Sequence, residues 1–238
     1  MNRRGGAAAI GFVALLAACT AAYLPSEPRE GAPGPGPLSD GARSGTAQPL
    51  AVLGAPDRRV GRIAAHASGH CRLQECALGS LVADAVLWHY ANQGAVAAIL
   101  PSNAIRGFLR EGDVRNGDIE TALAAERVGV REMRGAEIRV RLEEALRAST
   151  GEAAAFPQVA GLRYVWSPSH PPGRRLMSVE VADGAGRYAP LSIGKLYRVA
   201  LRTAEASGGD VDLPRIFAVY LEQRSPLIPP APGRIVER

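Results

Sequence analysis

Two of the three cysteines, Cys71 and Cys76, lie five positions apart and lead directly into a segment with helical periodicity. A disulfide between them would close a short loop at the entrance of that helix. Closing so short a loop contributes only about 2 kcal/mol in the chain-entropy model, so the disulfide would act mainly on local shape. The loop contains Arg72, and a guanidinium held in place suits an anionic ligand because its donors match carboxylate and phosphate oxygens.

A zinc half-site is the competing interpretation of the same pair. A Cys-x4-Cys pair needs two further ligands to complete a zinc site. The third cysteine is Cys19, so no second pair is present, and the nearest histidines are His66 and His70. The sequence therefore favours the disulfide, and we expect no metal ion and no other cofactor.

The first residues have the features of an export signal. A basic start at residues 2–4 precedes an apolar run from Ala7 to Ala18, which is too short to span a bilayer as a mature helix. The run ends in Leu-Ala-Ala-Cys, which resembles a bacterial lipobox. In that interpretation residues 1–18 are removed, and Cys19 carries acyl chains that hold the protein to a lipid bilayer. An ordinary secretory signal with an incidental Cys19 is the alternative.

The lipobox predicts a lipid-anchored protein of the bacterial cell envelope, on the periplasmic or outer-membrane face. Export also supports the disulfide, because disulfides persist in oxidising compartments. Residues 19–57 are rich in Pro, Gly, Ala and Ser, a composition typical of a disordered tether. Residues 58–238 have globular patterning and form the predicted folded domain, which is long enough for one core.

Helical and alternating patterns interleave along this predicted domain. Helical spacing predicts helices at about 78–92, 116–125, 135–146 and 216–221. Alternation or short apolar runs predict strands at 95–100, 128–132, 162–166, 176–181, 196–201 and 234–236. Helices mixed with hairpin-like strands predict an α+β fold, a single domain with a mixed β-sheet packed against helices.

The positive net charge of +5 does not indicate a nucleic-acid partner. Acidic residues accompany the arginines, as in Arg131-Glu132 and between Arg139 and Glu144, which is typical of solvated faces. Aromatic residues make up only 5% of the chain, which leaves few platforms on which bases could stack. We therefore expect no binding of nucleic acid.

Seven short motifs occur in a fixed order along the predicted domain. They lie at 71–85 (Cys-Arg-x-x-Glu-Cys-x-Leu-Gly-x-Leu-x-x-Asp-Ala), 103–106 (Asn-x-Ile-Arg), 112–119 (two Gly-Asp pairs), 156–161 (Phe-Pro-Gln-Val-x-Gly), 172–175 (Pro-Gly-x-Arg), 208–210 (Gly-Gly-Asp) and 233–235 (Gly-Arg-Ile). Together they resemble the C-terminal domain of the 5'-nucleotidase family, which includes ecto-5'-nucleotidases and periplasmic UDP-sugar hydrolases. The resemblance covers about residues 61–235 and implies the fold of that domain.

In that family the resembling domain supplies the substrate pocket, and a larger N-terminal metallophosphatase domain holds the metals and the catalytic histidine. The Asp-x-His and Asn-His-Asp/Glu motifs of the metallophosphatase do not occur here. The resemblance therefore implies a domain from a nucleotide-hydrolysing family that is non-catalytic by itself. Three roles stay open: a diverged substrate-recognition domain, the binding half of a split enzyme with a separate metallophosphatase, and a structural or adaptor module with an abandoned pocket.

The resemblance also assigns ligand-binding positions. Arg72 and Arg106 match family arginines of the nucleotide site, and Asp210 matches the aspartate that binds ribose hydroxyls. Gly161 is the glycine that ends the Phe-Pro-Gln-Val-x-Gly motif. Guanidinium and carboxylate groups suit phosphate and a diol, so these residues predict a remnant site for a nucleotide-like or other anionic small molecule.

The chain departs from the family where the base binds. The two phenylalanines that stack on the base fall on Ala125 and Ala204, and the glycine loop reads Pro-Ser-Asn-Ala at 101–104. Each stacking contact is worth roughly 1–3 kcal/mol, so losing two would weaken binding by a factor of about 30 or more. The aromatic residues considered as replacements, at positions that predict core or sheet, are Tyr90, Tyr164 and Trp166.

Overall fold

The computed structural model describes residues 53–149, 155–184, 186–203 and 209–238. Residues 1–52, and with them the predicted signal peptide and Cys19, lie outside the described part, as does Ala204. The described helices are α1 (Ala77–Tyr90), α2 (Asn116–Ala122), α3 (Gly135–Ala148) and α4 (Leu213–Arg224). None of them is long and apolar enough to cross a membrane.

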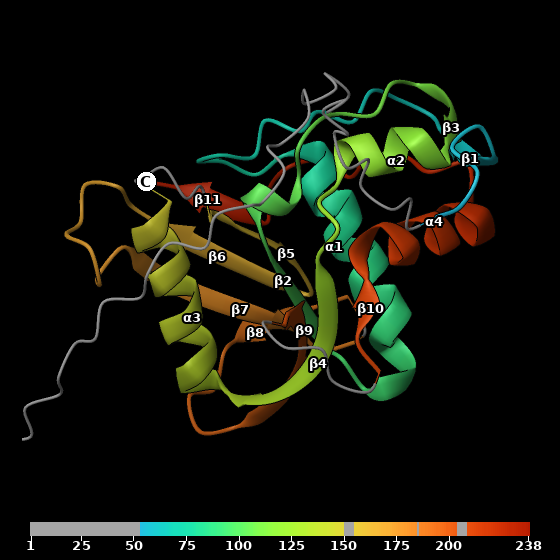
Figure 1. Cartoon of the computed structure of the whole chain (residues 1–238). Coiled ribbons are helices and arrows are strands. Elements are labelled where there is room, and N and C mark those ends of the chain that lie inside the picture. Colours follow the sequence, from blue (N-terminus) through green and yellow to red (C-terminus); the bar gives the residue numbers. More distant parts are fainter. Residues whose placement is uncertain (1–52, 150–154, 185, 204–208) are drawn as a thin grey trace, which may run out of the picture. The chain divides into compact units, whose positions relative to one another are not determined.

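The strands form three sheets in the described part of the chain (Figure 1). A pair consists of β1 (Arg59–Ile63) and β3 (Gly112–Arg115). The five-stranded sheet has the order β10 (Val211–Asp212), β4 (Arg127–Arg134), β9 (Leu196–Arg202), β2 (Ala97–Pro101), β5 (Pro157–Ala160). The four-stranded sheet has the order β11 (Ile235–Glu237), β6 (Leu162–Trp166), β7 (Leu176–Ala182), β8 (Tyr188–Pro190). Parallel and antiparallel pairs occur together, so the predicted α+β fold with mixed sheet and packed helices is confirmed.

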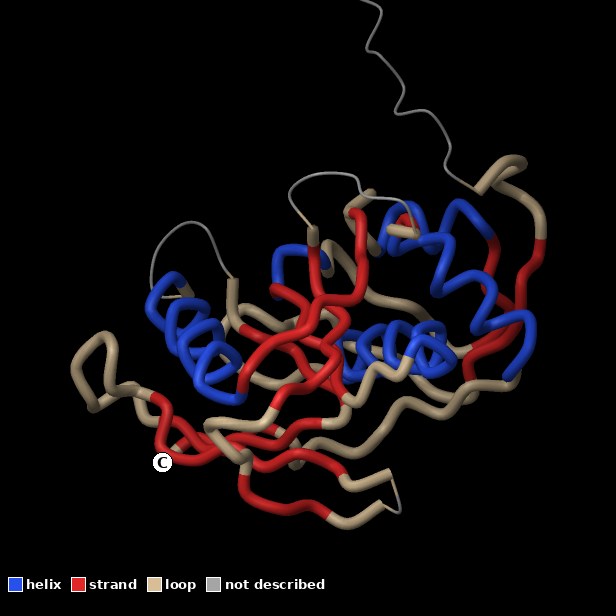
Figure 2. Tube along the Cα trace, turned by 90° about the horizontal axis from the view of Figure 1, so that it is seen from below, coloured by secondary structure: helices blue, strands red, loops and turns tan. Residues whose placement is uncertain are grey.

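The five-stranded sheet separates two hydrophobic cores. Successive residues of a strand point to opposite faces, and β2 shows this directly. Ala98 and Leu100 join the core formed with α1 and α4, whereas Ala97 and Ile99 join the core formed with α3. The helices α1 and α4 therefore lie on one side of the sheet and α3 on the other (Figures 1 and 2). Burial on both faces explains why the sequence of this strand is apolar throughout.

The order of the strands brings distant segments to one edge of this sheet. The strands β2 and β9 are parallel, and β4 is antiparallel to β9. The carboxyl ends of β2 and β9 consequently lie at the same edge as the beginning of β4. The residues after Pro101, those before Arg127 and those after Arg202 therefore leave the sheet at one edge.

The helix predicted at 116–125 begins at Asn116 as predicted but ends three residues earlier. It ends at Ala122, and the chain then enters β4. Asn116 is the first residue of the helix; it is buried and donates its side-chain amide to the carbonyl oxygens of Leu53 and Ala55. Asp118 caps the helix by accepting the backbone N–H of Arg115 at 2.8 Å. Leu53 and Ala55, which the sequence placed in the tether, thus contact α2.

Candidate functional site

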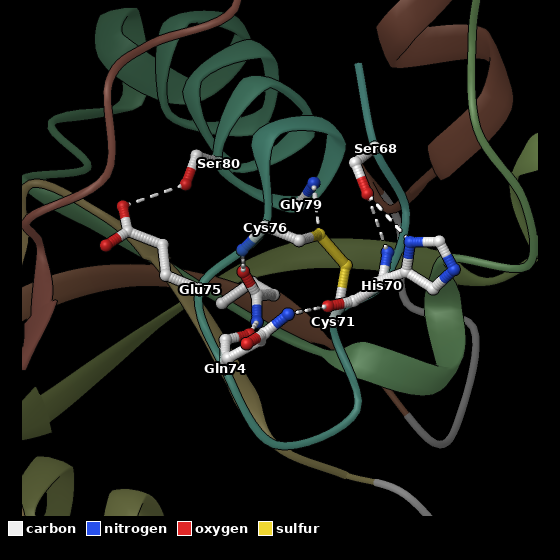
Figure 3. The surroundings of a disulfide bond; sticks show 9 residues. Ser68, His70, Cys71, Gln74, Glu75, Cys76, Gly79 and Ser80 are labelled. Atoms are coloured by element: carbon white, nitrogen blue, oxygen red, sulfur yellow. Dashed lines mark hydrogen bonds between the residues drawn. A yellow bond between two sulfur atoms is a disulfide. The ribbon is translucent and has the colours of Figure 1, made fainter. Parts of the chain in front are cut away.

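The disulfide between Cys71 and Cys76 is present and stands directly before α1 (Figure 3). Cys76 is the N-cap residue of the helix, with extended backbone dihedrals, and its Sγ accepts the backbone N–H of Gly79 at 3.1 Å. The first N–H groups of a helix lack partners within the helix. The disulfide sulfur supplies one of these partners, so the loop and the helix start are one unit.

Gln158 fastens this loop to β5. Its side chain is fully buried, and its Oε1 accepts the N–H of Cys76 at 3.2 Å. Its Nε2 donates to the carbonyl oxygen of Gln74 at 2.8 Å. Both ends of the amide are thereby satisfied, as a buried amide requires. The glutamine of the Phe-Pro-Gln-Val-x-Gly motif therefore has a structural role, which is to hold the disulfide loop against β5.

Glu75 connects the loop to the segment 233–235. Its Oε2 accepts three consecutive backbone N–H groups, from Gly233 at 2.7 Å, Arg234 at 2.9 Å and Ile235 at 3.1 Å. Its Oε1 accepts the hydroxyl of Ser80 at 3.1 Å. We call this arrangement the Glu75 clamp. It places the motif at 71–85 and the terminal Gly-Arg-Ile motif in direct contact.

Arg234 strengthens the same junction from the other side. Its guanidinium donates two hydrogen bonds to the carboxylate of Asp84 on α1, at 2.7 and 2.8 Å. Burial by itself lowers the pKa of Arg234, but the hydrogen bond and the charge of Asp84 outweigh it and raise the pKa above its ordinary value. Arg234 is therefore a fixed cation that binds β11 to α1.

Arg72 is exposed at the rim of a surface hollow of ≈ 430 Å³. The hollow lies between the disulfide loop, with His70 and Gln74, and the residues after β2, with Ser102 and Asn103. The guanidinium of Arg72 has no hydrogen bond or ion pair with any residue that the structure describes. The carboxylate of Glu75 could otherwise pair with Arg72, but it accepts the hydrogen bonds of the Glu75 clamp instead. The hollow therefore presents an unpaired cation to solvent.

Close backbone contact holds the two sides of this hollow together. A Cβ at Gly69 would lie 1.5 Å from the carbonyl oxygen of Gly107, so only glycine fits there. Arg106 follows Ile105, which lines the hollow, and its backbone N–H is bonded to Ala122 at 2.8 Å. The Arg106 side chain is exposed, without a partner among the described residues, and does not line the hollow itself.

Asp210 belongs to a different environment. Its side chain is only 3% exposed, with Oδ2 3.8 Å from the Nη2 of Arg131. Its Oδ1 lies where a Cβ on Gly129 would be, at 2.0 Å, so the carboxylate packs against β4. The backbone carbonyl of Asp210 accepts a hydrogen bond from Arg127. The structure thus brings Arg72 and residues 102–105 together, whereas Asp210 is directed into the sheet and does not line the hollow.

Gly161 and Ala125 are the other predicted site residues in the described part of the chain, and each lies in different surroundings. Gly161 lies between β5 and β6 with φ +67°, and a Cβ there would be 2.1 Å from the carbonyl oxygen of Val96. This glycine is therefore required by the backbone. Ala125 is exposed before β4 and offers only a methyl group where the family has a stacking ring. Within the described residues no group of three or more His, Cys, Asp and Glu could hold a metal ion.

The aromatic residues considered as replacements for the stacking rings are all in the core. Tyr90, Tyr164 and Trp166 are at most 3% exposed. Burial raises the pKa of Tyr164 well above its ordinary value, and the nearby charge of Glu75 raises it further. The hydroxyl of Tyr164 donates to the carbonyl oxygen of Pro157 at 2.8 Å. These rings therefore pack the protein and do not offer a base-stacking surface.

Sequence reasoning missed the two residues that build the loop, Glu75 and Gln158. Both lie inside ordered motifs, at 71–85 and 156–161. The available signals were an acidic residue between the two cysteines and an amide in the otherwise apolar motif at 156–161. Their partners lie 158 to 160 and 82 to 84 positions away along the chain, so no local pattern reveals them.

The family model of the 5'-nucleotidase C-terminal domain matches residues 56–217. The chain belongs to this family. The 5'-nucleotidase C-terminal domain described here is 30% identical over 143 residues to the trifunctional nucleotide phosphoesterase of Bacillus subtilis, covering 59% of this chain and 10% of that protein. It is 32% identical over 146 residues to the apyrase of Aedes albopictus, covering 59% of this chain and 26% of the apyrase.

Solved structures agree with this assignment. The 5'-nucleotidase precursor from Thermus thermophilus superposes with a TM-score of 0.69 at 28% identity, over 76% of this chain and 39% of that one. The NAD nucleotidase of Haemophilus influenzae, at 20% identity and a TM-score of 0.65, shares the fold. The domain spans well under half of the length of each of these relatives.

Proposed function

We propose that this 5'-nucleotidase C-terminal domain recognises a phosphate-bearing, nucleotide-like ligand at the hollow beside Arg72. The observation that carries the proposal is the unpaired guanidinium of Arg72, held by a disulfide loop that Gln158 and the Glu75 clamp fix in place. The loop fixes the backbone from which Arg72 projects, and the free guanidinium fork matches the oxygens of a phosphate group. Relatives named as a nucleotide phosphoesterase and an apyrase support a nucleotide as the ligand class.

We also propose that this chain by itself binds the ligand but does not hydrolyse it. The Asp-x-His and Asn-His-Asp/Glu motifs of the metallophosphatase are absent from the sequence. A separate metallophosphatase would then supply the metals and the attacking water, and this domain would hold the substrate. Release of phosphate from AMP by the pure protein with added Mn²⁺ or Co²⁺ would contradict this part. Failure to recover any metallophosphatase with the protein from its native membranes would contradict the split enzyme.

A structural or adaptor module is the second candidate. It is favoured by the carboxylate of Asp210, which is buried against β4 beside Arg131 and does not face the hollow. It is also favoured by Ala125, which offers no stacking surface. The two candidates differ in one measurable property, the affinity of the hollow for phosphate compounds.

Substituting Arg72→Ala should weaken binding of AMP and of inorganic phosphate by about 10-fold or more. A hydrogen bond to a charged group contributes about 1.5–3 kcal/mol, which corresponds to that range. Isothermal titration or ligand-observed NMR would measure it, with Arg215→Ala on α4 as a control of equal charge. Adenosine, which lacks the phosphate, should bind no better to the native protein than to Arg72→Ala. An absence of binding by every compound at millimolar concentration would establish the adaptor candidate instead.

The proposal also places the domain at a bacterial membrane through lipidated Cys19. Cys19→Ala should move the protein from the membrane fraction of cells to the soluble fraction, because acyl chains provide the attachment. Fractionation followed by immunoblotting measures this, and Cys71→Ala, which leaves the lipobox intact, is the control. An unchanged distribution for Cys19→Ala would refute the anchor.

A further inference from the structure

Phe108 is the most exposed of the Phe, Tyr and Trp residues that the structure describes, at 49%. The residue after it, Leu109, exchanges two backbone hydrogen bonds with Ala67, at 2.9 and 3.1 Å, and both of these side chains are buried. Successive residues of an extended segment point to opposite sides. The paired backbone therefore directs the ring of Phe108 away from the core and into solvent.

Two exposed side chains contact the ring of Phe108. The imidazole centroid of His66 lies 5.4 Å from the centroid of the Phe108 ring, and the two rings are tilted by 46°. The guanidinium carbon of Arg110 lies 5.7 Å from the same centroid. Neither side chain forms a hydrogen bond or an ion pair with any residue in the described part of the chain. Phe108 keeps its exposure with both neighbours in place, and these neighbours can turn aside for a planar ligand group.

Phe108 also lines a hollow of ≈ 480 Å³, separate from the one beside Arg72. This hollow lies between residues 107–114, which include the start of β3, and helix α2 (Figure 1). Arg106 stands between the two hollows along the chain, because Ile105 lines one and Gly107 lines the other. From residue 106 to residue 108 an extended chain spans about 7 Å, which is comparable with the separation of phosphate and base in a nucleoside monophosphate.

Charge does not select the ligand of this second hollow. Its charged lining residues are Arg110, Glu111, Asp113 and Asp118. Asp113 is paired with Arg59 at 3.0 Å, and Asp118 accepts a backbone N–H as the cap of α2. Arg110 and Glu111 remain, and their formal charges cancel. The exposed ring is therefore the feature that distinguishes this hollow, and it favours a planar, uncharged group.

We infer that Phe108 is the stacking platform for the base of the nucleotide-like ligand. The inference rests on the proposed function, because the phosphate of the same ligand is held at Arg72. Every base has a π-face on which an aromatic ring can stack, and the guanidinium of Arg110 can stack on the base in turn. Phe108 thus takes the place of the rings that the family has at the positions of Ala125 and Ala204.

Isothermal titration of the full chain with AMP and with ribose 5-phosphate, which has no base, tests this inference. AMP should bind to the native protein about fivefold or more tightly than ribose 5-phosphate, which is the range of one stacking contact. Phe108→Leu keeps an apolar side chain but has no ring. It should lower the affinity for AMP to that for ribose 5-phosphate and leave the affinity for ribose 5-phosphate unchanged. Phe108→Trp, which keeps a ring, should retain the preference for AMP.

The outcomes separate this inference from the proposed function. If the native protein binds neither compound, both fail. If it binds the two with equal affinity, or if Phe108→Leu keeps the preference for AMP, the phosphate site stands and Phe108 is not the platform. Ile193→Ala removes another exposed apolar side chain, beside α3, and should change neither affinity; an equal effect of this control would also overturn the inference. Melting curves verify that each variant is folded, and Phe108→Ala decides if Phe108→Leu is not.

Discussion

Glu75→Ala is expected to lower the free energy of unfolding by about 2–4 kcal/mol, because three backbone N–H groups lose a charged acceptor at once. These are the N–H groups of residues 233–235, which the Glu75 clamp holds at 2.7 to 3.1 Å. The expected decrease in the free energy of unfolding is smaller than the sum of three hydrogen-bond energies. The clamp is partly exposed, so water can replace the carboxylate at some positions. Urea denaturation followed by circular dichroism measures the change.

Two milder substitutions calibrate this prediction. Glu75→Gln keeps an acceptor oxygen but removes the charge, so its effect should be about half as large. Ser80→Ala removes only the hydroxyl that donates to Glu75 and should cost about 1 kcal/mol. If Glu75→Ala is no more destabilising than Ser80→Ala, then the clamp does not contribute to stability in the way its geometry indicates.

Gly161→Ala is expected to destabilise the domain by about 3 kcal/mol or more, the range in which backbone strain and overpacking combine. The residue has φ +67°, which a side chain disfavours. Its Cβ would also lie 2.1 Å from the carbonyl oxygen of Val96 and 3.1 Å from the Cα of Ala97. Because these are backbone atoms at the start of β2, they can move only if that strand shifts within the sheet.

The matched control is Gly173→Ala. Gly173 also has positive φ, +92°, but a Cβ added there would have no atom within 4 Å. Its substitution should cost only the backbone term, about 1 kcal/mol. Equal losses for the two variants in thermal or urea denaturation would show that the contact with Val96 is unimportant.

Much of the fold follows from local patterns. The helical spacing before Tyr90, the apolar run that becomes β2 and the alternation of Leu162–Trp166 correspond closely to α1, β2 and β6. These elements are long or regular enough for their own sequence patterns to predict them. The strands β1, β3, β5, β8 and β10 were not predicted, and they have two to five residues each. Such short segments become strands because a partner lies beside them, and a single sequence does not show the partner.

In the candidate site, too, the features that depend on nearby residues were predictable and those that depend on distant residues were not. The position of Arg72 was predictable, since the disulfide and the helix start are encoded within a few residues of it. The burial of Asp210 was not, because it depends on Gly129 in a strand about 80 positions away, where the missing side chain leaves room for the carboxylate. The unpaired state of Arg72 depends in turn on Glu75, whose partners are supplied by the residues around Arg234.

The Glu75 clamp also joins segments from opposite ends of the folded domain. Its partners at residues 233–235 lie 158 to 160 positions after Glu75. A chain that ends before residue 233 keeps the cysteine pair and the residues of α1 but lacks the three backbone N–H groups that Glu75 accepts. We therefore expect ligand recognition at this turn to require the distal end of the domain.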